Sequence, residues 1–211
     1  MTYYPVYLSL QGKKVLLIGG GNIALQKIPA LLEAEASILL VSPEVLPDVA
    51  AFAQAGRLRW EKRGYATQDL DGAALVIAAT DDENLQQRVA SESRARGIWV
   101  NIVDVPPLCD FIAPAIVRRG AIQIAISTGG ASPALAKLLR QKLEPLVGPE
   151  YAELAAMAQR ARPRVLEWPR DKRLSFWNRV VSEPFLEMIR RDGAARAEQQ
   201  LQEWLNGNAA L

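Results

Sequence analysis

The stretch "KKVLLIGGGNIALQK", residues 13–27, decides the fold. A short apolar run ends in three glycines, and a helical pattern follows at once. The form G-x-G-x-x-A is given by Gly19, Gly21 and Ala24. A strand, a glycine turn and a helix in this order are typical of dinucleotide-binding domains, in which the phosphates lie at the helix N-terminus. The alternative is a glycine turn that binds nothing.

The chain on either side of this motif alternates between β-rich apolar runs and helical patterns. Strands are expected at 13–20, 37–42, 57–63, 74–80 and 98–103, and helices at 22–34, 44–56 and 83–97. Strands that are apolar almost throughout and separated by helices indicate a parallel sheet covered on both faces. Residues 1–112 are therefore predicted to form a Rossmann-like, doubly wound α/β domain.

The pattern changes in the second half of the chain. One more strand is expected at 121–128, followed by a helix with Ser132 as N-cap and Pro133 in its first turn. From residue 150 onward the sequence predicts helices only, punctuated by prolines that include Pro163. Phe176, Trp177 and Phe185 have the spacing of core residues. We expect a segment at 113–149 and a small all-helical domain at 150–211.

Composition excludes several functions. The 211 residues are 50% hydrophobic and include no histidine, which removes Ser-His-Asp triads and zinc sites built on histidine. Acid–base chemistry is left to carboxylates, Lys, Tyr or Cys. The single Cys109 forms no internal disulfide. The chain shows no signal-peptide pattern and no apolar run of membrane-spanning length, so a cytoplasmic protein without a membrane partner is expected.

Charge is unevenly distributed along the chain. The net charge, counted as Lys and Arg residues minus Asp and Glu residues, is 10 − 13 = −3 for residues 1–112. It is 5 − 2 = +3 for 113–150 and 10 − 8 = +2 for 151–211. The basic middle segment suits an anionic small molecule better than a nucleic acid, because it lacks interleaved aromatic residues. Arg118, Arg119 and Lys137 are candidate substrate ligands, and the alternative is that they simply face solvent.

The cofactor residues follow from the motif and from the strand ends. Gly19 permits the tight turn, and Gly21 lets the backbone approach a pyrophosphate closely. Ser42 stands where dinucleotide-binding domains carry a ribose-binding acid, and no arginine there favours a 2′-phosphate, so NAD is preferred to NADP. Thr80 and Asp81, in "AATDDEN", are predicted to contact a ribose, although this stretch also reads as a helix N-cap.

The stretch "NIVDVPPLCDF", residues 101–111, contains the candidate for catalysis. Asp104 follows an apolar strand, at the edge where open α/β sheets bind ligands, and it is either a reactive carboxylate or a turn-forming residue. Asn101 is a candidate substrate contact or a structural amide. The loop "STGGASP" adds Ser127, Thr128 and Gly129, whose donors suit a carboxylate as well as a capped turn.

These features together resemble a known family. "GKKVLLIGGGNIALQK", "VIAATDDENLQQRV", "VNIVDVPPLCDFIAPAIVRRG" and "IAISTGGASPALAKLLRQKLE" are similar, in order and spacing, to precorrin-2 dehydrogenases of the siroheme synthase N-terminal type. The resemblance implies NAD-dependent oxidation of precorrin-2 to sirohydrochlorin in siroheme or cobalamin synthesis. It also implies a nucleotide-binding domain, a central dimerisation segment of a homodimer and a helical C-terminal domain.

Residue roles follow from the same resemblance, which implies that Gly19, Gly21, Asn22 and Ile23 form the pyrophosphate loop and that Thr80 and Asp81 lie on the ribose side. It places Asp104 in the active site, where a carboxylate base can take the proton while NAD takes the hydride. Some members also insert ferrous iron into sirohydrochlorin. The sequence leaves this open, since Asp104, Cys109 and Asp110 are too few to define a metal site.

Two other classes of protein stay in competition. A non-catalytic NAD-sensing module would need the glycine loop but not Asp104. A generic short dehydrogenase is disfavoured, because residues 1–150 contain no Tyr-x-x-x-Lys spacing.

Overall fold

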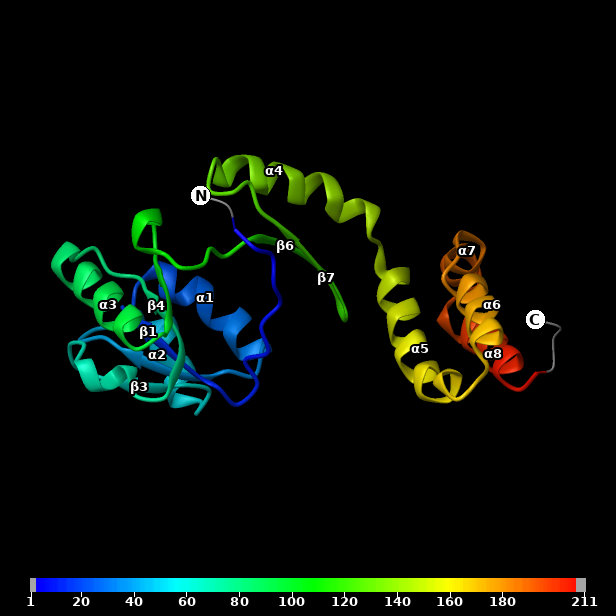
Figure 1. Cartoon of the computed structure of the whole chain (residues 1–211), viewed down its shortest axis with the longest axis horizontal. Helices are drawn as coiled ribbons and strands as arrows, with labels where there is room; N and C mark the ends of the chain where they lie inside the picture. The colour runs from blue at the N-terminus through cyan, green and yellow to red at the C-terminus, as the bar shows by residue number, and fades with distance from the viewer. Residues whose placement is uncertain (1–2, 208–211) are drawn as a thin grey trace. The chain divides into compact units, whose positions relative to one another are not determined.

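A parallel five-stranded sheet forms the first part of the chain (Figure 1). The computed structural model describes residues 3–207 and separates two units, one up to Ala113 and one from Pro114. The strand order is β3-β2-β1-β4-β5, which confirms the Rossmann-like prediction. The strands are β1 (Lys14–Ile18), β2 (Ser37–Val41), β3 (Arg59–Glu61), β4 (Ala73–Ala78) and β5 (Trp99–Ile102).

Helices cover both faces of this sheet because side chains alternate along each strand. Val15 and Leu17 of β1 pack on one face with residues of α1 (Asn22–Glu33) and α2 (Pro47–Gln54). Leu16 and Ile18 pack on the other face with residues of α3 (Glu83–Ala95). Two short 3₁₀ turns, η1 (Thr67–Leu70) and η2 (Pro106–Leu108), complete this unit. The predicted helices and strands all form, with ends shifted by a few residues.

The carboxyl ends of four strands come together at one edge of the sheet. Ile18 of β1 is in register with Val41 of β2 and with Ala78 of β4. Ala78 is in turn in register with Ile102 of β5. The loops that follow these strands therefore leave the sheet at the same edge, the one that binds ligands in folds of this type.

The second unit begins with an antiparallel hairpin that was only half predicted. β7 (Ile122–Ile126) was expected, whereas β6 (Ala115–Arg119) was not recognised as a strand. Its five residues end in two arginines and give too short a run for periodicity to identify. The hairpin turns at Gly120, whose φ of +55° favours glycine and where a Cβ would make a tight contact of 3.0 Å with Ala152 Cβ.

Helices make up the rest of the second unit. After the hairpin come α4 (Pro133–Leu143) and a 3₁₀ turn, η3 (Glu144–Leu146), then α5 (Pro149–Leu166), α6 (Arg170–Val180), α7 (Glu183–Asp192) and α8 (Ala194–Leu205). Phe176 and Phe185 are buried in a core built by α5 to α8, and Trp177 packs against it, which confirms their packing role. Phe176 makes edge-to-face contacts with Trp168 and Trp177, with ring centroids 5.4 and 5.1 Å apart.

Pro163 lies inside α5 and does not end it. Its ring is on the exposed side of the helix, and the neighbouring Ala161 and Val165 are buried in the core. A proline inside a helix costs about 3 kcal/mol, and core burial on both sides of it offsets this cost.

Candidate functional site

The glycine loop is fixed between the ends of the neighbouring strands. Gly19 has φ +99°, and a Cβ at this position would lie 2.0 Å from the carbonyl oxygen of Ala79, beyond β4. Its amide donates to the carbonyl of Val41 at 3.0 Å, and the amide of Leu46 donates to the carbonyl of Gly20 at 2.9 Å. Only glycine fits at position 19, since both the backbone conformation and the close approach exclude a side chain.

Gly21 stands at the N-terminus of α1 and meets a different environment. Its φ of −86° is open to any residue, and a Cβ there would find no atom within 4 Å. No side chain caps this helix, and its first turn carries no acidic residue. The amides of Asn22 and Ile23 therefore lie in the uncapped first turn, beside open space. Free amides and the positive end of the helix dipole suit a pyrophosphate, so the residues present fit a dinucleotide.

The predicted ribose contacts lie at the same edge of the sheet. Ser42, directly after β2, is buried, and its hydroxyl donates to the carbonyl of Glu44 at 2.5 Å. Asp82 is the N-cap of α3, because its carboxylate accepts from the amide of Leu85 at 3.1 Å. Within the stretch "AATDDEN", the N-cap is therefore Asp82. The exposed Asp81 and the partly exposed Thr80 lie on the loop before it.

Asp104 follows β5 in a turn that the amide of Val105 closes on the carbonyl of Ile102, at 3.1 Å. Its φ is +62°, a left-handed conformation that few residues other than glycine adopt and that Asn and Asp tolerate best. The side chain is exposed, and within residues 3–207 its carboxylate takes part in no hydrogen bond or ion pair. Asp104 therefore forms the turn and also presents a free carboxylate at the ligand-binding edge.

Asp110, six residues further on, is engaged on both of its oxygens. Oδ1 accepts from Arg94 Nε at 2.8 Å, and Oδ2 accepts from the amide of Val100 at 3.2 Å. The amide of Asp110 donates back to the carbonyl of Val100 at 2.8 Å. Sequence reasoning did not foresee the part played by Arg94, and no local pattern could have indicated it, because the two side chains are 16 positions apart.

The other polar groups of this loop are also engaged. Asn101 Nδ2 donates to the carbonyl of Phe111 at 2.9 Å, as the structural-amide alternative has it. Cys109 Sγ donates to the carbonyl of Ile102 at 3.0 Å, and burial raises the pKa of its thiol. Asp104 is thus the carboxylate of this loop that the protein leaves free for chemistry.

The remaining predicted residues belong to the second unit. Thr128 Oγ1 bonds both the amide and the carbonyl of Ser132 at 3.1 Å, and Ser127 Oγ accepts from the amide of Gly129 at 3.0 Å. Ser132 caps α4 as predicted. The loop is therefore a capped turn, and Gly129 has φ +63°.

The basic candidates of this unit have different surroundings. Arg119 donates to the carbonyl of Glu144 at 3.2 Å and approaches its carboxylate at 3.6 Å, which ties β6 to the end of α4. Arg118, on β6, is paired in register with Gln123. Lys137 is exposed on α4.

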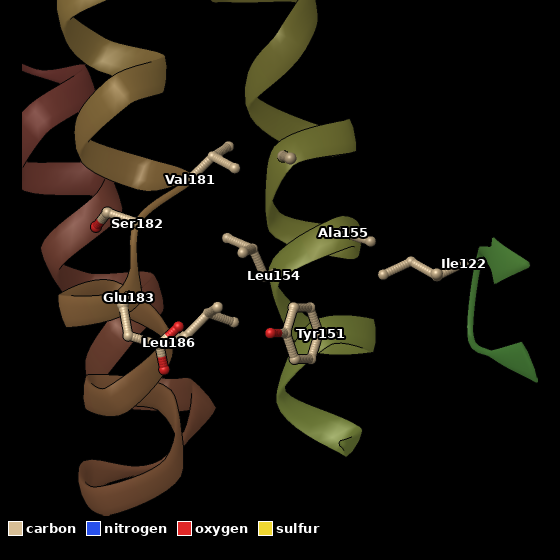
Figure 2. A pocket seen from close by; sticks show the side chains of 9 residues that line it. Ile122, Tyr151, Leu154, Ala155, Val181, Ser182, Glu183 and Leu186 are labelled. Atoms are coloured by element: carbon tan, nitrogen blue, oxygen red, sulfur yellow. The ribbon is translucent and has the colours of Figure 1, made fainter. Parts of the chain in front are cut away.

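A pocket of about 450 Å³ is lined by residues of the second unit alone (Figure 2). Tyr151 and Leu154 of α5, Val181 and Leu186 form most of its apolar wall. The two polar residues at its rim are engaged elsewhere, since Ser182 caps α7 and Glu183 pairs with Arg190 at 2.6 Å. None of the predicted site residues lines this pocket.

Two further searches of the described residues gave negative results. Within 3–207, no group of three or more Cys, Asp or Glu side chains is arranged to hold a metal ion. None of the helices in this range combines the length and the apolar character needed to cross a membrane.

The sheet order, the glycine loop and the uncapped helix define an NAD(P)-binding domain of the Rossmann type. Comparison with known families agrees. Residues 6–115 match a family described as putative NAD(P)-binding, 119–145 the sirohaem biosynthesis protein central region and 150–205 the sirohaem synthase dimerisation region. The chain therefore belongs to the family formed by the N-terminal region of siroheme synthases.

Individual relatives support this assignment. The siroheme synthase of Pseudomonas entomophila is 43% identical over 98% of the chain, and that of Thioalkalivibrio sulfidiphilus is 40% identical over 93%. The match covers 45% and 41% of these relatives, so the chain spans less than half of their length. A solved structure described as SirC, precorrin-2 dehydrogenase, shares the fold, with a TM-score of 0.77 at 24% identity over 95% of this chain and all of the other.

Proposed function

We propose that the chain catalyses the NAD-dependent oxidation of precorrin-2 to sirohydrochlorin. The observation that carries this proposal is the free carboxylate of Asp104, which shares a sheet edge with the glycine loop while Asp110 beside it is fully paired. The relatives' name, siroheme synthase, and that of the structural neighbour, precorrin-2 dehydrogenase, support the choice of substrate.

The proposed reaction removes one hydride and one proton from the macrocycle. NAD, when bound, supplies the hydride acceptor, and the Asp104 carboxylate accepts the proton. Gly19, Gly21, Asn22 and Ile23 hold the pyrophosphate. The hydroxyls of Ser42 and Thr80, with Asp81, contact the ribose units. NAD is preferred to NADP because residues 42–44 after β2, Ser-Pro-Glu, offer no cation for a 2′-phosphate.

Most of the proposed substrate contacts belong to the second unit. Precorrin-2 carries eight carboxylates, and the segment 113–150 has a net charge of +3. We assign carboxylate binding to the loop Ser127–Thr128–Gly129 and to Arg118, Arg119 and Lys137, with Asn101 at the end of β5 as a further contact. Arg119 can serve both Glu144 and a substrate, because its guanidinium has five N–H donors.

A homodimer in the cytoplasm is part of the proposal, with functional divisions at 1–112, 113–149 and 150–211. The leucines of α4 fall on one side of the helix, and Leu135 and Leu138 among them are 45% and 47% exposed. An apolar helix face of this kind is suited to burial against a second copy. The match of residues 150–205 to the sirohaem synthase dimerisation region supports the homodimer, while the assignment of the α4 face rests on its exposed leucines.

The test is anaerobic incubation of the purified protein with precorrin-2 and NAD, followed by absorbance. One NADH for each sirohydrochlorin formed is the expected result. Binding of NAD without oxidation would instead favour the NAD-sensing module. The name of the relatives also favours a second candidate activity, insertion of ferrous iron into sirohydrochlorin, and adding Fe²⁺ after oxidation tests it by the appearance of siroheme.

A further inference from the structure

β5 is the edge strand of the sheet, and the segment that follows it folds back along its open side. The amide and carbonyl of Val100 both face this side, and both are bonded by Asp110, through its side chain at 3.2 Å and its backbone amide at 2.8 Å. Asp110 thus takes the place of a neighbouring strand. Between Val100 and Asp110 the chain forms the turn that contains Asp104.

Arg94 fixes Asp110 from the other side. This arginine lies in the last turn of α3, and its Nε donates to Asp110 Oδ1 at 2.8 Å, so each carboxylate oxygen has its own partner. The pair is partly shielded, with the two side chains 42% and 27% exposed. One carboxylate therefore joins the strand, the helix and the loop.

Asp104 needs such a support because its left-handed backbone is unfavourable for a residue with a side chain. A conformation of this kind persists where the surrounding structure determines it. We propose that Asp110, held by Arg94, is a positioning residue that fixes the turn carrying Asp104 in its reactive place. The inference rests on the proposed role of Asp104.

The chain offers a matched control for this inference. Arg96, which follows α3 directly, pairs with Asp71 at 2.7 Å, an ion pair of the same type that does not involve the segment 103–110. Asp110→Asn keeps an acceptor for the Val100 amide and loses the ion pair, and Arg94→Gln removes the pair without altering Asp110. Asp71→Asn removes the control pair.

Two measurements are made on the full chain: hydrogen exchange of residues 103–109 and steady-state oxidation of precorrin-2. Asp110→Asn and Arg94→Gln are expected to speed exchange in this segment and to lower kcat about 10- to 100-fold, the loss expected from a displacement of about 1 Å, with the Kd for NAD unchanged. Asp71→Asn should behave as the wild type.

Unchanged exchange at 103–109 in Asp110→Asn would overturn the inference, as would faster exchange with an unchanged kcat. An equal loss of kcat in Asp71→Asn would also overturn it, because the effect would then be general. A wild-type protein without precorrin-2 dehydrogenase activity would contradict the proposed function instead. Hydrogen exchange at 103–109 would still decide whether Asp110 holds the turn.

Discussion

Substitution of Gly21 by alanine separates folding from cofactor binding. The backbone at Gly21, φ −86° and ψ −164°, is open to alanine, and the new methyl group would meet no atom within 4 Å. Alanine is a poorer N-cap than glycine by about 0.5–1 kcal/mol. It also stabilises by about 0.4–1 kcal/mol through the entropy of the unfolded chain. The two effects cancel, so the free energy of unfolding should stay within about 0.5 kcal/mol of the wild type.

In the proposed binding mode, the same methyl group lies where the pyrophosphate approaches the backbone. A charge-assisted hydrogen bond contributes about 1.5–3 kcal/mol. Loss of one such bond from a backbone amide in the first turn of α1 to the pyrophosphate should therefore raise the Kd for NAD at least about tenfold. Isothermal titration calorimetry measures the affinity, and urea unfolding followed by circular dichroism measures the stability.

Gly19→Ala provides the contrast. Its left-handed backbone costs alanine about 1–2 kcal/mol, and the clash with the carbonyl of Ala79 adds about 1–3 kcal/mol, so this variant should lose about 2–5 kcal/mol of stability. The reasoning is refuted if Gly21→Ala binds NAD as the wild type does, or if it is destabilised as much as Gly19→Ala.

Two other predictions concern an ion pair and the apolar face of α4. The Arg63 guanidinium bonds both oxygens of the buried Asp69 and lowers the pKa of that carboxyl. The stabilisation is therefore complete above the unfolded pKa of about 3.9 and is lost as the pH falls through the folded value. Asp69→Asn should lower the urea midpoint at pH 7 and remove the part of the loss of stability at low pH that comes from this ion pair. A pH profile of the midpoint like that of the wild type would contradict this role of Asp69. If the chain forms the proposed dimer, Leu138→Asp on α4 should convert it to a monomer in light scattering, while Lys137→Asp, one residue away, should have a smaller effect. A dimer that persists in Leu138→Asp would exclude this face as the interface.

The sequence predicted those structural features whose physical cause lies in neighbouring residues. The apolar runs predicted a parallel sheet because strands covered on both faces need apolar residues at successive positions. The tight turn at Gly19 was predicted correctly because a left-handed backbone of this kind favours glycine, and the structure adds the close approach to Ala79. Ser132 was predicted as an N-cap because serine, followed by proline, is typical of a helix start.

Properties that depend on distant partners could not be predicted. Asp104 and Asp110 look alike in the sequence, yet only the fold brings Asp110 to Val100 and Arg94. The role of Arg119 depends in the same way on Glu144, 25 residues away. The helix at α4 was predicted, but a helical pattern does not show whether its apolar face is buried within the same chain.

Asp104→Asn tests the account most directly. Asparagine tolerates the left-handed backbone as aspartate does and has almost the same shape, so the variant removes the proton acceptor and retains the turn. With precorrin-2 and NAD under anaerobic conditions, kcat should fall about 10²- to 10⁴-fold, while the Kd for NAD and the free energy of unfolding stay at their wild-type values. Oxidation at the wild-type rate in this variant would contradict the central claim that the Asp104 carboxylate accepts the proton.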